Sequence, residues 1–206
     1  MRIPLTALLA CVTLSAADYK AESAGAPPSD VPPAFAQVLQ KEGTRIVGPS
    51  GPVMEIWLVS TAPKGPKTSE SNVTLTEVPH GALMGVVRFP ATGKDRRGTQ
   101  VKAGTYTARF SMFPISGDHQ GIAPQRDFWV LTRIADETDP NVKPDYDTLM
   151  KWSSKASGTP HPLVMSVWKA DEAKADFYSS GESDWVLQRQ MGDVWLAIIV
   201  AGTAAA

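Results

Sequence analysis

Three histidines are the residues whose type could do chemistry, and all three lie in turn-like segments. His80 is in the sequence VPHG, His119 in GDHQG and His161 in TPHP. Loops on a rigid sheet are where binding and catalytic residues usually lie. If these imidazoles converge with the carboxylate of Asp118 or Asp127, they could bind a divalent metal. The chain has no HExxH motif and no short-spaced ligand pair, so the simpler prediction is no cofactor, with each histidine bracing its loop.

The polar loop from Gly117 to Asp127 holds the second group of candidates. Arg126 could pair with Asp127 and fix the loop, or it could present its guanidinium to an anionic or sugar ligand. Bracing is favoured because long loops between strands need polar ties for their backbone groups. The candidate ligand-binding residues are Asp118, His119, Gln125, Arg126, Asp127 and His161, and the alternative metal-binding set is His80, His119 and His161.

Acidic and aromatic residues offer two further patterns. The acidic segment from Asp136 to Asp147 has the oxygen donors that calcium prefers, but it lacks the spacing of an EF-hand loop. Six tryptophans could line a sugar-binding face. Five of them lie in predicted strands, where aromatic side chains ordinarily pack in the core, so we expect them to be packing residues.

The elements that must position these residues are mainly strands. The segment Thr105–Phe113 alternates between apolar and polar residues, which is typical of a strand with one wet face. Similar patterns predict about eight consecutive strands, with hairpin turns at Gly48–Gly51 and at Gly192, and two short helices capped by Asp30 and Asp145. Glu55 interrupts one apolar strand, and an exposed charge on an edge strand is favoured over a buried, paired group. Strands that follow one another directly favour an antiparallel sheet. We therefore predict a mainly β fold, an antiparallel β-sandwich or flattened barrel of about eight strands with two short peripheral helices.

The N-terminus and the charge indicate where the chain works. Residues 1–17 combine Arg2, an apolar run and a small-residue ending, so we predict a signal peptide. Residues 18–30 are expected to be a flexible leader, and residues 31–206 a single β-sandwich domain. Cleavage after Ala17 would leave no cysteine, whereas a lipoprotein anchored at Cys11 is the alternative. Twenty basic residues against 21 acidic ones give no basic face, which argues against nucleic acid as a partner.

Several segments carry a resemblance to known proteins. These are VKAGTYTARF, GDHQGIAPQRDF, ASGTPHP and DWVLQRQMGDVWLAIIV. The chain resembles a group of uncharacterised exported bacterial proteins, of a kind found in acidobacteria. That group is distantly similar to a domain-of-unknown-function family with a "lpaGtYtlf" strand, onto which Ala103, Gly104, Thr105 and Tyr106 match. The resemblance implies an exported all-β domain and implies no activity.

These patterns predict a non-enzymatic exported domain, periplasmic or extracellular, with a binding or structural role. Its partner would be a small molecule, a glycan or an envelope protein, and no membrane span would remain after signal cleavage. One alternative is a metal-assisted hydrolase with its site at the His119 and His161 loops. Another is a carbohydrate-binding module, which would need at least two coplanar exposed Trp or Tyr rings.

Overall fold

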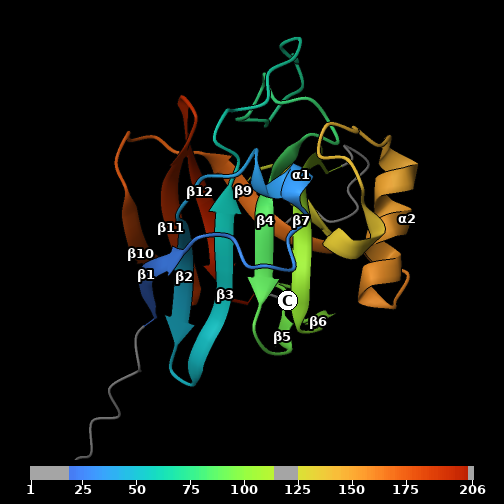
Figure 1. Cartoon of the computed structure of the whole chain (residues 1–206). Helices are drawn as coiled ribbons and strands as arrows, with labels where there is room; N and C mark the ends of the chain where they lie inside the picture. The colour runs from blue at the N-terminus through green and yellow to red at the C-terminus, as the bar shows by residue number, and fades with distance from the viewer. Residues whose placement is uncertain (1–18, 114–124, 204–206) are drawn as a thin grey trace, which may run out of the picture.

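Ten antiparallel strands form one curled sheet in the computed structural model, which describes residues 19–113 and 125–203. The sheet is nearly closed as a barrel (Figure 1). In spatial order its strands are β1 (Lys20–Gly25), β2 (Gly43–Gly48), β3 (Gly51–Leu58), β4 (Leu83–Phe89), β7 (Gly104–Met112), β8 (Asp127–Arg133), β9 (Leu163–Lys169), β12 (Val194–Ala201), β11 (Asp184–Met191) and β10 (Asp176–Ser180). A separate small hairpin joins β5 (Gly93–Lys94) to β6 (Gln100–Val101).

The predicted fold class is confirmed in its coarse form, and the predicted number of strands is wrong. The chain is mainly β with two short α-helices, but the main sheet alone has ten strands rather than about eight. The structure also places Lys20–Gly25 in strand β1, where a flexible leader over residues 18–30 was predicted. This edge strand forms because its backbone pairs with β2, from Lys20 against Val47 to Ser23 against Thr44. Its own side chains carry little apolar pattern.

Strand β7 crosses the middle of the sheet and is buried on both faces. Tyr106, Ala108 and Phe110 point into the barrel and are fully buried. The predicted wet face is wrong, because Thr107 and Arg109 on the other side are also fully buried. Other parts of the chain therefore cover the outer face of the sheet here.

Two segments provide this cover. Residues 26–42, which include helix α1 (Pro33–Ala36), pass over the outer face of β2, β3 and β4 (Figure 1). The indole Nε1 of Trp57 donates to the carbonyl of Gly25 at 2.9 Å, and the hydroxyl of Thr105 donates to Asp30 at 2.6 Å. Asp30 thus ties this segment to β7 instead of capping α1, whose N-cap is Pro32.

The second covering segment contains the short 3-10 helix η1 (Ile134–Asp136) and helix α2 (Tyr146–Ser157), which lies against β8 and β9. As predicted, Asp145 caps α2 by accepting a hydrogen bond from the backbone of Thr148 at 2.8 Å. Leu149 packs in a small apolar cluster with Phe128 and Val130. No described helix covers the outer face of β12, β11 and β10, and together with the Trp168 end of β9 we call this the open face. Within the described ranges, none of the helices has the length and apolar character needed to cross a membrane.

Candidate functional site

The predicted loop residues that the structure describes hold the chain together at one end of the barrel. Gln125 is buried, and its amide donates to the carbonyl of Val167 at 2.7 Å. Arg126 donates through Nε to the carbonyl of Phe113 at 2.7 Å and pairs through Nη1 with Glu70 at 2.7 Å. These contacts favour the bracing interpretation. Asp118 and His119 lie outside the described residues.

Asp127 is a buried anchor for the segment before β4, and the predicted Arg126–Asp127 ion pair does not form. Its carboxylate accepts hydrogen bonds from the backbone and hydroxyl of Thr74, at 2.7 and 2.8 Å, and from the backbone of Leu75 at 3.1 Å. Burial raises the pKa of Asp127, while the hydrogen bonds from Thr74 and Leu75 act in the opposite direction. A carboxylate engaged in this way does not face a ligand.

His80 and His161 lie at opposite ends of helix α2. The ring of His80 is centred 6.0 Å from that of Tyr146, the first residue of the helix, and its Nδ1 lies 3.2 Å from the hydroxyl of Ser111. The backbone carbonyl of His161 accepts from Ser157, the last residue of the helix, at 2.8 Å. Twelve helical residues span about 18 Å. His80 and His161 therefore cannot share one metal ion, and the alternative three-histidine set does not close.

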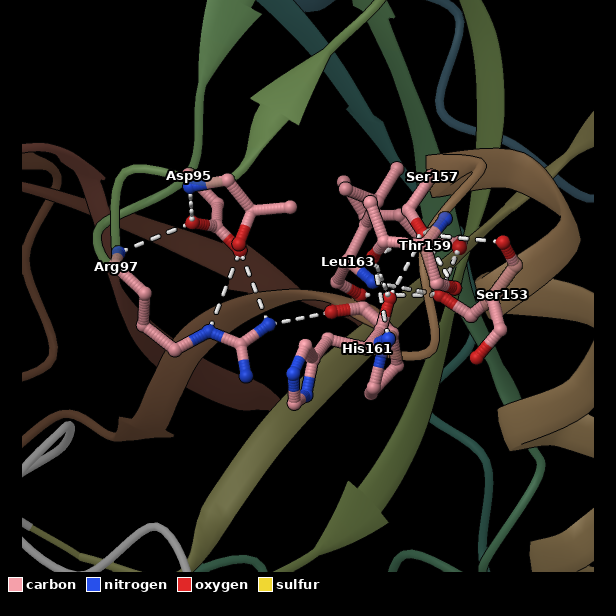
Figure 2. A network of polar contacts seen from close by, with 11 residues as sticks. Asp95, Arg97, Ser153, Ser157, Thr159, His161 and Leu163 are labelled. Carbon is pink, nitrogen blue, oxygen red and sulfur yellow. Dashed lines mark hydrogen bonds and ion pairs between the residues drawn. The ribbon is translucent and has the colours of Figure 1, made fainter.

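The hydrogen bonds of His161 are made by its backbone rather than by its ring (Figure 2). Ser157 and Thr159 donate to its carbonyl, and no hydrogen bond of its imidazole is found among the described residues. Nearby, Arg97 pairs with Asp95 and also donates to the carbonyl of Pro162. This network ties the end of α2 to the start of β9 and to the β5–β6 turn. In the described part of the chain, no group of three or more His, Cys, Asp or Glu residues is placed to hold a metal ion.

A cavity of about 280 Å³ opens on the open face, at a place that the loop motifs did not indicate. It is lined by Trp168 of β9, Tyr178 of β10, Gln188 of β11, and by Asp171, Glu172, Lys174 and Asp176. Trp168 and Tyr178 are both half-buried, and both pack against a small apolar cluster of Val186, Ala197 and Ile199.

The register of the strands explains why a hollow forms here. Trp168 lies opposite Ala197, Ala197 lies opposite Gln188, and Gln188 lies opposite Asp176. These four residues form a row across β9, β12, β11 and β10, so they share the outer face. Strands lie about 4.8 Å apart, which gives this row a width of about 14 Å. The small side chain of Ala197 leaves the middle of the row low between two larger neighbours.

The rim of the cavity is a loop, residues 170–175, that Gln188 holds in place. The amide of Gln188 donates to the carbonyls of Glu172 and Lys174, at 2.6 and 2.9 Å. The ammonium of Lys174 pairs with Glu172 at 2.7 Å and with Asp176 at 3.5 Å. The three carboxylates at the rim, including that of Asp171, thus face one cation, and the cavity has an excess of negative charge.

The pKa of Tyr178 is shifted by the charges around this cavity. Burial raises the pKa of its phenol, and the nearby carboxylates of Asp176 and Asp171 raise that pKa further, while Lys174 acts in the opposite direction. The phenol therefore stays protonated and can donate a hydrogen bond at neutral pH. The combination of aromatic rings, an acidic rim and a hydroxyl donor suits an uncharged or positively charged polar ligand.

The sequence around Trp168 contains a signal for this cavity. Of the five strand tryptophans expected to pack in the core, Trp57 and Trp129 are fully buried, Trp185 and Trp195 are half-buried, and so is Trp168. It is followed by KADEAKADFY, in which acidic residues precede another aromatic residue. A tryptophan at the end of a strand, followed by an acidic loop and an aromatic edge strand, predicts a rimmed aromatic surface.

Comparisons with known proteins found no relative whose site could be compared with this cavity. No protein-family model, no curated protein and no solved structure matches the chain. The resemblance to exported bacterial proteins therefore stays a prediction, and the function is argued from the residues of the site.

Proposed function

We propose that this chain is a non-enzymatic exported binding domain that holds a carbohydrate on the open face. The sugar would lie in the cavity between Trp168 and Tyr178. The observation that carries this proposal is that two aromatic side chains and an acidic rim line one cavity. It corresponds to the carbohydrate-binding alternative from the sequence, with Trp168 as one of the six tryptophans considered there and Tyr178 as a residue that was not.

The chemistry of the cavity fits a sugar ring in two ways. Aromatic side chains offer a flat apolar surface on which the C–H face of a sugar can pack, and Tyr178 adds a polar group. The carboxylates of Asp171, Glu172 and Asp176 accept hydrogen bonds, which matches the donor-rich edge of a sugar. The amide of Gln188 holds the backbone carbonyls of Glu172 and Lys174, which fixes the rim, whereas the ion pairs of the exposed Lys174 add little.

The size and charge of the cavity narrow the ligand class. A volume of about 280 Å³ lies just below the range for small-molecule sites, about 300–1,000 Å³. This favours a mono- or disaccharide, or the end of a longer glycan. The negative excess at the rim disfavours acidic sugars, because like charges would face each other across a partly dry site. We therefore expect neutral or amino sugars to bind and uronates not to bind.

A glycan array followed by isothermal titration calorimetry tests the proposal. Trp168→Ala removes one stacking surface and should weaken binding of the best neutral glycan by about tenfold, which corresponds to about 1.4 kcal/mol. Trp152→Ala is the matched control, because Trp152 is a half-buried tryptophan on α2, away from the cavity. The Trp152→Ala variant should bind the same glycan with the affinity of the unmodified chain. An array without a bound glycan, or equal affinities for the two variants, would refute the proposal.

A further inference from the structure

The two edge strands of the sheet, β1 and β10, meet without hydrogen bonds between them, and we call the gap between them the seam. Both edges lie on the same side of the barrel (Figure 1). At one end of β11 the seam is closed by aromatic contacts, with Trp185 centred 5.5 Å from Tyr19 and 5.2 Å from Phe177. At the other end Arg189 reaches across the seam and donates through Nε to Thr44 of β2 at 3.2 Å.

A cleft of about 440 Å³ opens in the seam beside Arg189. Its apolar lining includes Ile56 and Leu58 of β3 and Leu187 of β11, which are all buried. Leu187 and Arg189 are two residues apart in β11 and so point to the same inner face of the sheet. The cleft therefore combines an apolar floor with a guanidinium at its mouth.

Among the described residues, no carboxylate forms an ion pair with Arg189. Nε donates to Thr44, and Nη1 donates to the backbone carbonyls of Asp176 and Gln188, at 3.1 and 2.8 Å. Nη2 donates no hydrogen bond to a described residue. Burial lowers the pKa of Arg189, and only the more distant carboxylate of Asp176 acts in the opposite direction.

All but one of the other arginines of the described chain are paired with a carboxylate, and the exception, Arg133, lies over the ring of Tyr106. Arg45, Arg88, Arg96, Arg97, Arg109 and Arg126 each form an ion pair. Two glutamates line the cleft, but Glu22 pairs with Arg45 and Glu42 accepts a hydrogen bond from Ser23. Neither forms an ion pair with Arg189. The guanidinium of Arg189 is thus partly buried, donates only to neutral oxygen atoms, and keeps Nη2 for a further acceptor.

We propose that the seam is a binding site for an amphipathic monocarboxylate, such as an alkanoate of medium length. The apolar tail would lie against Ile56, Leu58 and Leu187, and the carboxylate would accept a hydrogen bond from Nη2 of Arg189. The volume of about 440 Å³ lies within the range of small-molecule sites. This site is on the inner face of the sheet and is independent of the carbohydrate proposal, which concerns the outer face.

The first test compares three probes with the same tail on the unmodified chain. Decanoate, decan-1-ol and decyltrimethylammonium are titrated in turn by calorimetry. The carboxylate should bind at least tenfold more tightly than the alcohol, because a charge-assisted hydrogen bond to a guanidinium is stronger than a neutral one. The ammonium probe should bind most weakly. Equal affinities for decanoate and decan-1-ol would overturn the proposal without any variant.

Variants of Arg189 assign the site. Arg189→Gln should reduce decanoate affinity to that of decan-1-ol and leave the alcohol unchanged, whereas Arg189→Lys should retain the preference for the carboxylate. Arg88→Gln is the matched control, because Arg88 lies on the outer face and Glu55 keeps its contact with Arg45. Retained preference for decanoate in Arg189→Gln would place the carboxylate elsewhere. If Arg189→Gln does not fold, the proposal is tested by the preference of Arg189→Lys for decanoate over decan-1-ol and by the comparison of the three probes on the unmodified chain.

Discussion

The buried ion pair between Arg109 and Glu137 should be the most sensitive polar contact of this fold. The side chain of Arg109 is 0% exposed and that of Glu137 is 2% exposed. Arg109 donates to Glu137 through Nε at 2.8 Å and also through Nη2. Its Nη1 donates to the carbonyls of Gly81 and Val142, at 2.8 and 2.5 Å. One guanidinium thus fixes the segment before β4 and the segment between η1 and α2.

The change Arg109→Met removes the charge and every one of these hydrogen bonds. Glu137 would keep only the hydroxyls of Thr107 and Thr132 as partners, so a buried carboxylate would lose its cation. Removing one member of a buried pair costs about 3–5 kcal/mol. We expect a loss of about 4 kcal/mol, a large part of the 5–15 kcal/mol typical of a domain.

Urea denaturation at pH 7, followed by tryptophan fluorescence, measures the free energy of unfolding of each variant. The double change Arg109→Met with Glu137→Leu removes both charges and should recover more than half of the loss. Lys155→Met is the matched control, because it breaks an exposed ion pair: the side chain of Lys155, which pairs with Asp136, is 69% exposed. This variant should lose less than about 1 kcal/mol of unfolding free energy. A loss below about 1 kcal/mol for Arg109→Met, or a double variant no more stable than the single one, would refute this reasoning.

Two further predictions concern pH and backbone geometry. Burial lowers the pKa of His80, so its contribution to stability is present above the ordinary histidine value of about 6.5 and is lost as the pH falls through the window below it. His80→Gln should therefore flatten the dependence of the unfolding free energy on pH between about 5 and 7.5, and a slope equal to that of the unmodified chain would contradict this. Gly158 ends α2 at a φ of 72°, with no atom nearer than 4.0 Å to an added Cβ, so Gly158→Ala should cost about 1 kcal/mol from the backbone alone. Gly192→Ala should cost clearly more in the same denaturation assay, because its Cβ would lie 2.5 Å from the backbone nitrogen of Ala62 at a φ of 57°; equal costs would be evidence against the clash.

Local sequence signals predicted the elements whose side chains carry a strong pattern. The hairpin between β2 and β3, the cap of α2 by Asp145 and the turn at Gly192 were all expected at the residues where they occur. Each of these depends on residues that are neighbours in the chain. β1 and β10 were missed because a short edge strand is fixed by its partner's backbone rather than by its own hydrophobic pattern.

Long-range polar contacts were the part of the fold that the sequence did not predict. Glu55 was expected to be an exposed charge on an edge strand, but it is 4% exposed and lies between Arg45 and Arg88. The pattern shows only that a glutamate interrupts an apolar strand. Its burial depends on β2 and β4 lying on both sides of β3, which is a property of the sheet order. The candidate cavity was missed for the same reason. Trp168 of β9 and Tyr178 of β10 line one cavity only because β12 and β11 lie between their strands in the sheet.

The way the sheet is covered explains why both proposed sites involve β10 and β11. Residues 26–42 and helix α2 bury the outer face over β2–β4 and β7–β9, so those strands are held from both sides. Within the residues that the structure describes, β10 and β11 lack such cover, and the seam beside them is closed by side chains. A ligand could enter the seam without breaking a hydrogen bond between strands, since β1 and β10 share none. Asp176 belongs to both places, because its backbone carbonyl accepts from Arg189 while its carboxylate lines the outer cavity. The two proposed sites are therefore neighbours on opposite faces of the sheet at Asp176, and each can be tested without the other.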